Sequence, residues 1–232
     1  MCARYKVEDD FLEYGDQILA AFDLQFTPDL FSTGDFYPTY NVITLRLDAS
    51  ERWKLQPSSW GLLPASWRPS KDATSASDIF KERKRFQRNK INARSETAHT
   101  TWPWKFSFKT QRCLMLATSF FEPHVEGGQA QYCLTDRRAF FIPALWSSWN
   151  TMTEGIDSVD SCVMLTTEAN DLVRTTRSGR LRQPVVLTDP DDCRRYCSTD
   201  VTEHAQLSPL FAPCDATSMS VEHLPKKAAA KM

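Results

Sequence analysis

The spacing of apolar residues along the chain predicts more strands than helices. From Glu8 to Phe22 apolar residues recur at helical spacing, which predicts a helix weakened by Gly15. Tyr40 to Leu47 alternates apolar and polar side chains, which is typical of a half-buried strand. Four further segments are rich in aromatic and β-branched residues and are also predicted to be strands: Cys113 to Phe121, Tyr132 to Thr135, Ala139 to Trp146 and Cys162 to Thr167.

Polar segments separate and end these elements. Pro69 to Ser77 is predicted to be a polar loop, and Leu224 to Met232 a frayed tail rich in Lys and Ala. Asp189 followed by Pro190 and two acids predicts a helix start, with an N-cap and a proline in the first turn. Strands outnumber helices without alternating with them, so we expect one α+β domain on a mostly antiparallel sheet. The domain is expected to span residues 1–224, followed by a flexible tail, 225–232.

Composition restricts the class of protein. The 232 residues are 41% hydrophobic, which excludes a disordered or fibrous chain and suits a single domain. No apolar run is long enough for a membrane span, and the first residues lack the apolar core of a secretory signal. The seven cysteines have no metal-ligand spacing, so we expect a reducing intracellular compartment, no metal and no cofactor.

Charge is balanced overall but separated along the chain. There are 28 Lys and Arg against 29 Asp and Glu, a net charge of −1, which by itself argues against a nucleic-acid partner. A basic run extends from Lys81 to Arg94, and a second cluster holds Arg174, Arg177, Arg180 and Arg182. Such separation can give a neutral protein a basic face, although either run could equally be solvated surface.

The second residue offers unusual chemistry. Cys2 would carry a free α-amine beside its thiol once Met1 is removed, a 1,2-aminothiol that an internal cysteine cannot provide. The amine can condense with an aldehyde to a Schiff base, and the thiol can then close a five-membered thiazolidine ring. Taken alone, a cysteine at this position is more often incidental.

A series of short motifs runs along the chain from residue 2 to about 187, most of its length. One of them is Asn92-Ala93-Arg94-Ser95-Glu96-Thr97. The others are Met1 to Tyr5, Tyr40 to Val42, Trp60 to Trp67, Arg112-Cys113, Phe120 to Glu122, Phe141 to Trp146, Thr166 to Ala169 and Arg182 to Leu187. In this order they resemble the motifs of the SOS-response-associated peptidase (SRAP) family of abasic-site processing proteins, and the most specific match is that of residues 92–97 to the family's Asn-Ala-Arg-x-Glu-Thr.

The resemblance implies a barrel-like sheet with flanking helices and a set of catalytic residues. Family members bind single-stranded DNA at abasic sites and form a thiazolidine through the cysteine that matches Cys2. Glu122 matches the glutamate expected to transfer protons, and its apolar neighbours could raise its pKa. Asn92 matches the asparagine that positions the opened sugar. Read alone, Glu122 would be a surface glutamate and Asn92 a turn residue.

The resemblance also implies DNA contacts. Arg4, Arg94 and Arg182 match arginines that hold phosphates, a contact that suits the guanidinium fork. Taken one at a time, each would be a surface salt bridge. A platform for unstacked bases is predicted from Trp60, Pro64 and Trp67, with core packing as the alternative.

One departure from the family pattern concerns catalysis. The histidine of the family's His-x-Arg-Met-Pro falls on Arg180, and arginine cannot pass a proton near neutral pH. We therefore expect crosslinking to survive, with histidine-dependent steps such as crosslink reversal slowed. Ala3 and Pro123 also replace family residues, which marks a divergent member.

The function predicted from the sequence is covalent capture of abasic sites in single-stranded DNA by an intracellular monomer. It would be nucleoid-associated in a bacterium or phage and nuclear in a eukaryote, with no membrane partner. Lyase activity through the Schiff base and removal of its own first residue are further expected activities. The alternatives are a non-catalytic single-stranded DNA-binding module, a peptidase acting on its own N-terminus, and a structural domain.

Overall fold

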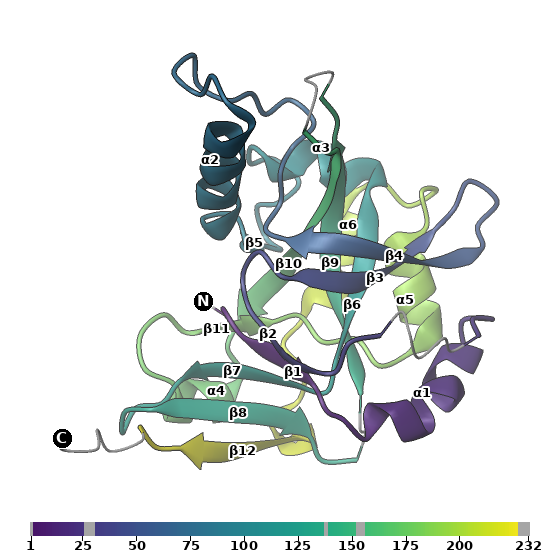
Figure 1. Ribbon diagram of the computed structural model, residues 1–232. Helices are drawn as coiled ribbons and strands as arrows, with labels where there is room; N and C mark the ends of the chain where they lie inside the picture. The colour runs from purple at the N-terminus through teal and green to yellow at the C-terminus, as the bar shows by residue number, and fades with distance from the viewer. Residues whose placement is uncertain (1, 26–30, 137–138, 152–155, 227–232) are drawn as a thin grey trace, which may run out of the picture.

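A five-stranded closed barrel forms the core of the chain (Figure 1). The computed structural model describes residues 2–25, 31–136, 139–151 and 156–226. Within these ranges β10–β4–β3–β6–β9 pair in that order, and pairing of β9 with β10 closes the ring. The barrel strands are β3 (Asn41–Leu47), β4 (Trp53–Trp60), β6 (Arg112–Ala117), β9 (Phe140–Trp149) and β10 (Val159–Glu168). Two short strands, β5 (Asn92–Arg94) and β11 (Arg182–Pro184), pair with β10.

A second sheet lies beside the barrel and is antiparallel throughout. Its order is β12–β8–β7–β1–β2, so the first strand of the chain is bonded on both edges. The five strands are β1 (Tyr5–Val7), β2 (Gly34–Phe36), β7 (Ser119–Pro123), β8 (Gln129–Leu134) and β12 (Met219–Leu224). The α+β architecture with a mostly antiparallel, barrel-like core is therefore confirmed, with parallel pairing only of β10 with β4 and β5 in the described part.

Helices flank the two sheets (Figure 1). They are α1 (Phe11–Ala20), α2 (Ala76–Arg88), α3 (Trp104–Thr110), α4 (Asp171–Thr176), α5 (Pro190–Cys197) and α6 (His204–Leu207), with 3-10 turns at Ser208–Phe211 and Ala216–Ser218. The predicted cap is confirmed, because the Asp189 side chain accepts hydrogen bonds from the N–H groups of Asp191 and Asp192. No helix in the described ranges is long and apolar enough to cross a membrane.

Two predictions about the elements need correction. Cys113 to Phe121 is not one strand: it divides at Thr118 into β6 of the barrel and β7 of the second sheet. The chain thus crosses between sheets inside a continuous apolar run, which the hydrophobic pattern could not reveal. Helix α2 begins within the predicted loop, where the Ser75 hydroxyl accepts from the N–H of Asp78. Residues 227–232 of the predicted tail lie outside the described ranges.

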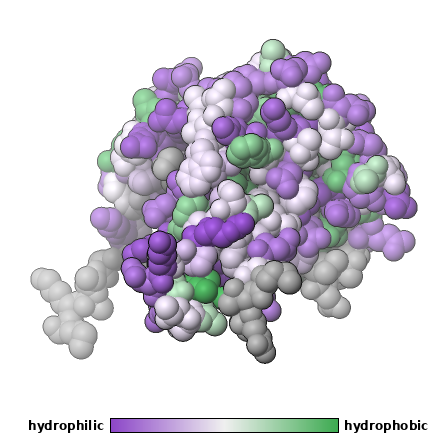
Figure 2. Space-filling model, turned by 90° about the horizontal axis from the view of Figure 1, so that it is seen from above, coloured by the Kyte–Doolittle hydropathy of each residue, from purple (hydrophilic) through white to green (hydrophobic). Residues whose placement is uncertain are grey.

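Apolar residues are scattered on the face of the molecule that Figure 2 shows. Seen from above in Figure 2, hydrophobic side chains lie singly or in small groups among hydrophilic ones. Such scattered groups are normal for a folded domain.

Replacing the buried Arg112 with methionine is expected to destabilise the fold. Its guanidinium donates to five carbonyl groups, those of Phe108, Lys109, Tyr196, Ser198 and Val201. Methionine leaves those carbonyls without the donor, at a cost of about 3 kcal/mol or more. This corresponds to a drop of roughly 6–12 °C in Tm. Thermal unfolding should show it, whereas Arg52→Met, which removes an exposed ion pair, should change Tm by about 2 °C or less.

Candidate active site at the amino terminus

The first strand brings Cys2 beside the strand that carries Glu122. Strands β1 and β7 pair antiparallel with Tyr5 opposite Phe120, and the Phe121 N–H donates to the Arg4 carbonyl at 3.0 Å. Because the pairing is antiparallel, the residues that precede Arg4 lie near the C-terminal end of β7, which holds Glu122. Figure 1 shows the chain starting between β5 and the β7–β8 hairpin. The predicted nucleophile and the predicted acid thus come from adjacent strands.

Asn92 lies against Cys2 from the other side. Its Nδ2 donates to the Cys2 carbonyl at 2.7 Å, a contact across 90 positions of sequence. Strand β5, which holds Asn92, is fixed by parallel pairing with Met164 to Thr166 of β10. The Asn92 Oδ1 is buried and accepts no hydrogen bond from the described residues. This oxygen can accept a hydrogen bond from a hydroxyl group of a ligand.

The Cys2 thiol is protonated in this environment. The side chain is fully buried, and its Sγ donates to the Arg4 carbonyl at 3.2 Å. Burial, followed by the nearby Glu122 carboxylate, raises the pKa of the Cys2 thiol to about 12. At neutral pH this thiol is therefore not a free thiolate, and any attack by sulfur must release its proton as the new bond forms.

Glu122 forms a buried ion pair with Arg177. The Arg177 Nη2 lies 2.8 Å from the Glu122 Oε2, and each side chain is only 1% exposed. Burial raises the pKa of Glu122 to about 7, although the Arg177 guanidinium favours the charged form. A carboxyl group that titrates near 7 can both give and take a proton at neutral pH.

Arg177 was missed as a site residue, and Arg180 occupies a different place from the one predicted. Arg180 is exposed in the turn between α4 and β11, and no described carboxylate lies within ion-pair distance of it. The guanidinium against Glu122 belongs to Arg177, which directly follows α4 and also donates to the Arg182 carbonyl. The sequence signal was present, because Arg177 belongs to a cluster of arginines without an acid, but its burial depends on the path of the chain.

The exposure of Arg180 changes what its substitution should do. Arg180→His is now expected to alter the release rate of a preformed crosslink by about twofold or less. Arg177→Gln, which removes the charge beside Glu122, should alter it by tenfold or more, the equivalent of about 1.4 kcal/mol. Time courses of release at pH 7 compare the two variants with the wild type. If Arg180→His changed the release rate more than Arg177→Gln did, Arg180 rather than Arg177 would be the arginine that affects crosslink reversal.

The three predicted phosphate-binding arginines differ in availability. Arg94 is exposed, whereas Arg182 is largely buried and forms a two-pronged ion pair with Glu96 at 3.0 and 2.8 Å. Arg4 pairs with Asp35 at 2.8 Å and lies 3.8 Å from the Phe121 ring centroid. The Arg94 guanidinium is thus accessible to a phosphate group, whereas Arg4 and Arg182 form ion pairs with carboxylates.

The predicted base platform is largely part of the core. Trp60 is fully buried, and its indole N–H donates to the Ile91 carbonyl at 2.9 Å. Trp67 is 9% exposed and packs edge-on against Trp149, with 5.4 Å between ring centroids, and Pro64 is also buried. The prediction of an exposed platform at these residues is therefore wrong. The large apolar surface of tryptophan suits both a protein core and a site where bases stack, so the residue type alone could not distinguish the two.

One cluster outside this site has metal-ligating side chains. His124, Glu126 and His223 bring ligand atoms within 4.8 Å of one another. The two imidazole rings stack with centroids 3.9 Å apart and planes 18° apart, so their in-plane lone pairs do not converge on one point. Hydrogen bonds already use nitrogens of both rings, one from the Glu126 N–H to His124 and one to the Gly127 carbonyl from His223.

The fold and the site define a barrel protein in which Cys2 is buried beside the Glu122 carboxylate. The SOS response associated peptidase (SRAP) model matches residues 1–229, so the chain belongs to this family. Abasic site processing protein YoqW of Bacillus subtilis (strain 168) is 28% identical, covering 94% of this chain and 90% of its own. Abasic site processing protein YobE of the same strain is 26% identical, covering 94% and 92%.

Solved structures show the same fold. A crystal structure of a protein from Bordetella bronchiseptica superposes with a TM-score of 0.73 at 20% identity, covering 96% of this chain and 99% of that one. A protein from Bacteroides thetaiotaomicron gives a TM-score of 0.72 at 16% identity, covering 97% and 93%. The family suggests processing of abasic sites in DNA, and the finer chemistry is argued below.

Proposed function

We propose that this protein captures abasic sites in single-stranded DNA by forming a thiazolidine through Cys2. The observation that carries the proposal is the convergence of three residues distant in sequence: Cys2, just before β1, Asn92 on β5 and Glu122 on β7. The opened sugar of an abasic site presents an aldehyde and a hydroxyl group. This cluster offers an aminothiol for the first and an unpartnered amide oxygen for the second.

The reaction needs two bond-forming steps that balance without a cofactor. After removal of Met1, the Cys2 amine adds to the aldehyde carbon and gives a carbinolamine, which loses water to form the Schiff base. The Schiff-base nitrogen keeps its proton, and the thiol then adds to the same carbon and gives its own proton to the Glu122 carboxylate, which closes the thiazolidine. The second step is intramolecular, because amine and thiol belong to one residue.

Glu122 is the proton donor and acceptor in this scheme. With its pKa at about 7, part of the population is protonated at neutral pH and can donate to the departing hydroxyl of the carbinolamine. The resulting carboxylate is stabilised by Arg177, 2.8 Å away. It can then accept the proton of the Cys2 thiol, whose raised pKa requires such a base.

The same Schiff base gives access to a secondary activity. It acidifies the adjacent sugar carbon, so loss of a proton there eliminates the 3′ phosphate and cuts the strand. We include this lyase step in the proposal, together with release of the residue before Cys2 by the same site. The lyase step would be slow relative to ring closure, which consumes the Schiff base, whereas release of the preceding residue must come first because it frees the Cys2 amine.

A denaturing gel tests the proposal. Mature protein is incubated with a labelled single strand carrying one abasic site, then heated before electrophoresis. We expect a heat-stable shifted band, lost when the aldehyde is first capped with an alkoxyamine or when a short extension blocks the Cys2 amine. Intact mass should show Cys2 as the first residue of the active protein. A shift seen only on a native gel would instead support a non-covalent binding module.

A further inference from the structure

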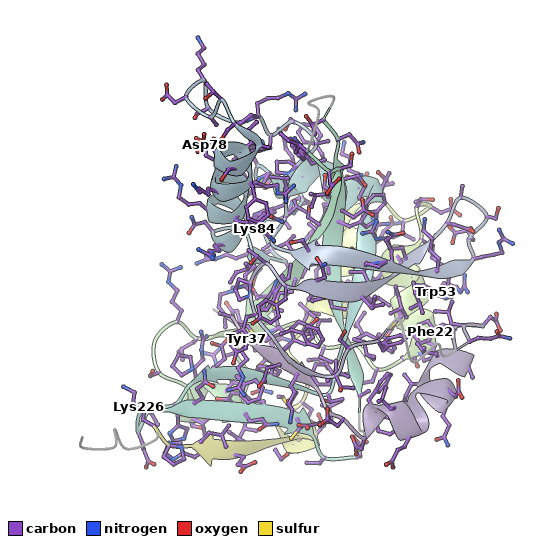
Figure 3. The ribbon with its side chains drawn as sticks, viewed as in Figure 1. Phe22, Tyr37, Trp53, Asp78, Lys84 and Lys226 are labelled. Carbon is purple, nitrogen blue, oxygen red and sulfur yellow. The ribbon has the colours of Figure 1, made fainter. Side chains whose placement is uncertain are left out.

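Exposed aromatic rings and cations alternate along one side of the molecule, beginning beside the Cys2 site. We call this the aromatic strip and define it as Arg4, Tyr37, Tyr40, Lys84 and Phe80. Tyr37 is 39% exposed, Tyr40 52% and Phe80 51%, all unusually open for large apolar side chains. Figure 3 shows Lys84 on the lower part of α2 and Tyr37 below it.

The turn that carries the two tyrosines is tightly held. The Tyr40 N–H donates to the Tyr37 carbonyl at 3.0 Å, Pro38 occupies the second position, and Thr39 the third with φ of 73°. A left-handed conformation is costly for a β-branched residue and is normally left to glycine. Two backbone hydrogen bonds to Trp60, of 2.7 and 2.9 Å, hold Thr39 and Tyr40 to the end of β4. The rings are therefore presented from a rigid base.

Two of the three rings of the strip, Tyr37 and Phe80, have a cation near them, and the third, Tyr40, packs against Tyr37. Arg4 lies 6.0 Å from the Tyr37 centroid, and the Tyr37 and Tyr40 rings meet edge-on at 5.6 Å. Lys84 donates to the Thr39 carbonyl at 3.1 Å and lies 5.7 Å from the Phe80 centroid. These contacts connect the Cys2 site to α2 without a gap, since the Arg4 carbonyl also accepts from the Cys2 thiol.

The acidic side chains of α2 are turned elsewhere. Asp78 accepts from the Ser75 hydroxyl and Glu82 from Ser70, so both carboxylates face the loop that precedes the helix. On α2, Lys84 reaches the turn that carries the tyrosines, while Arg83 lies 5.2 Å from the Phe80 centroid and donates to the Asp157 carbonyl at 3.5 Å. Since Asp35 pairs with Arg4, the positive charge of the strip comes from Lys84, for which no ion pair is found among the described residues, in a chain whose net charge is −1.

We propose that the aromatic strip binds the stretch of single-stranded DNA next to the lesion. Bases stack on Tyr37, Tyr40 and Phe80, while Lys84 neutralises a phosphate. Alternating rings and cations suit an unpaired strand, because every base has a face to stack and a duplex hides those faces. This inference rests on the proposed function only in placing the lesion at Cys2.

Binding of lesion-free DNA tests the strip independently of the crosslink. A fluorescent oligothymidylate is titrated with wild type, Tyr40→Ala, Phe80→Ala and the double variant, with affinity read by anisotropy. Loss of one stacked base should weaken binding by about 5- to 150-fold, and the double variant should lose more. Tyr40→Phe, which keeps the ring, should stay within about twofold of wild type.

Phe106→Ala is the matched control. Phe106 lies on α3, outside the strip, and is 66% exposed. The Lys105 Nζ is 5.1 Å from its ring centroid, so this pair has the same ring-and-cation geometry as the strip. It should bind the oligonucleotide like wild type. Unchanged affinity in the strip variants, an equal loss in Phe106→Ala, or equal affinity of wild type for duplex DNA would each overturn the proposal.

Crosslinking separates this inference from the proposed function. A very short oligonucleotide does not reach the strip, so the strip variants should crosslink its abasic site as fast as wild type. With a long oligonucleotide at sub-saturating protein, their crosslinking should be slower than that of wild type. If wild type forms no crosslink at all, the proposed function is wrong. The anisotropy measurements then still show whether the aromatic strip binds single-stranded DNA. Matching Tm values for all variants establish that the fold is intact.

Discussion

Replacing Cys2 with alanine is expected to abolish the heat-stable adduct completely. Alanine keeps the α-amine but removes the sulfur, so the reaction stops at a Schiff base, which water reverses. Only trapping with borohydride should then reveal a covalent product. The effect is all-or-none because the other cysteines in the described ranges lack an adjacent free amine.

Cys133→Ala provides the control for Cys2. Cys133 is a half-buried free cysteine on β8, away from the site, so its loss should leave the band unchanged. A heat-stable band that persists in Cys2→Ala without borohydride would show that another group makes the bond. It would then exclude the thiazolidine.

Replacing Glu122 with glutamine is expected to slow crosslinking by about 10²- to 10⁴-fold, the usual contribution of a positioned acid–base group. The amide keeps the shape of the carboxyl but cannot transfer a proton. The pH profile should change as well. In the wild type the rate rises as the amine, with a pKa near 8, loses its proton, and falls as Glu122 loses its proton through its pKa of about 7.

These opposing requirements give the wild type a maximum between about pH 7 and 8, set by the Glu122 and amine pKa values. In Glu122→Gln the falling side of the profile should disappear, so the residual rate climbs with pH to a plateau. Single-turnover rates from pH 5.5 to 9 measure this. Glu168→Gln, at an exposed glutamate 3.6 Å from Arg174, is the control. A falling side that survives in Glu122→Gln would assign it to another group.

Glutamine at position 122 also leaves a buried guanidinium without its counter-ion. Removing one member of a buried pair typically costs about 3–5 kcal/mol, so the variant should unfold at a lower temperature. Rates are therefore compared well below its Tm. Loss of rate with an intact fold separates the chemical role of Glu122 from its structural one.

Local sequence patterns predicted the parts of the fold whose structure is decided locally. The cap at Asp189 and the strand from Asn41 to Leu47 depend on residues a few positions apart, and both are present. The division at Thr118 depends on which sheet each half of an apolar run joins. Helix α2 has a strongly polar sequence with few apolar residues, so its sequence indicates a run of charge rather than a helix.

The candidate site, like the fold, could be predicted from the sequence only in part. Cys2, Asn92 and Glu122 were found through motifs, and the structure brings them together. Arg177 was not, because nothing in a run of arginines tells which one is buried against a carboxylate. For Trp60 and Trp67 the sequence left a base platform and core packing open, because residue type does not report burial, and the structure buries both.

The position of β1 between β2 and β7 has a mechanical consequence. DNA joined to Cys2 would be anchored three residues before a strand that is bonded along both edges. A motor enzyme pulling on that DNA would load this strand in shear against its neighbours, rather than stretching a loose terminus. Dislodging the protein would then require tearing the first strand out of the sheet, so the lifetime of the obstacle would follow the unfolding rate of the domain.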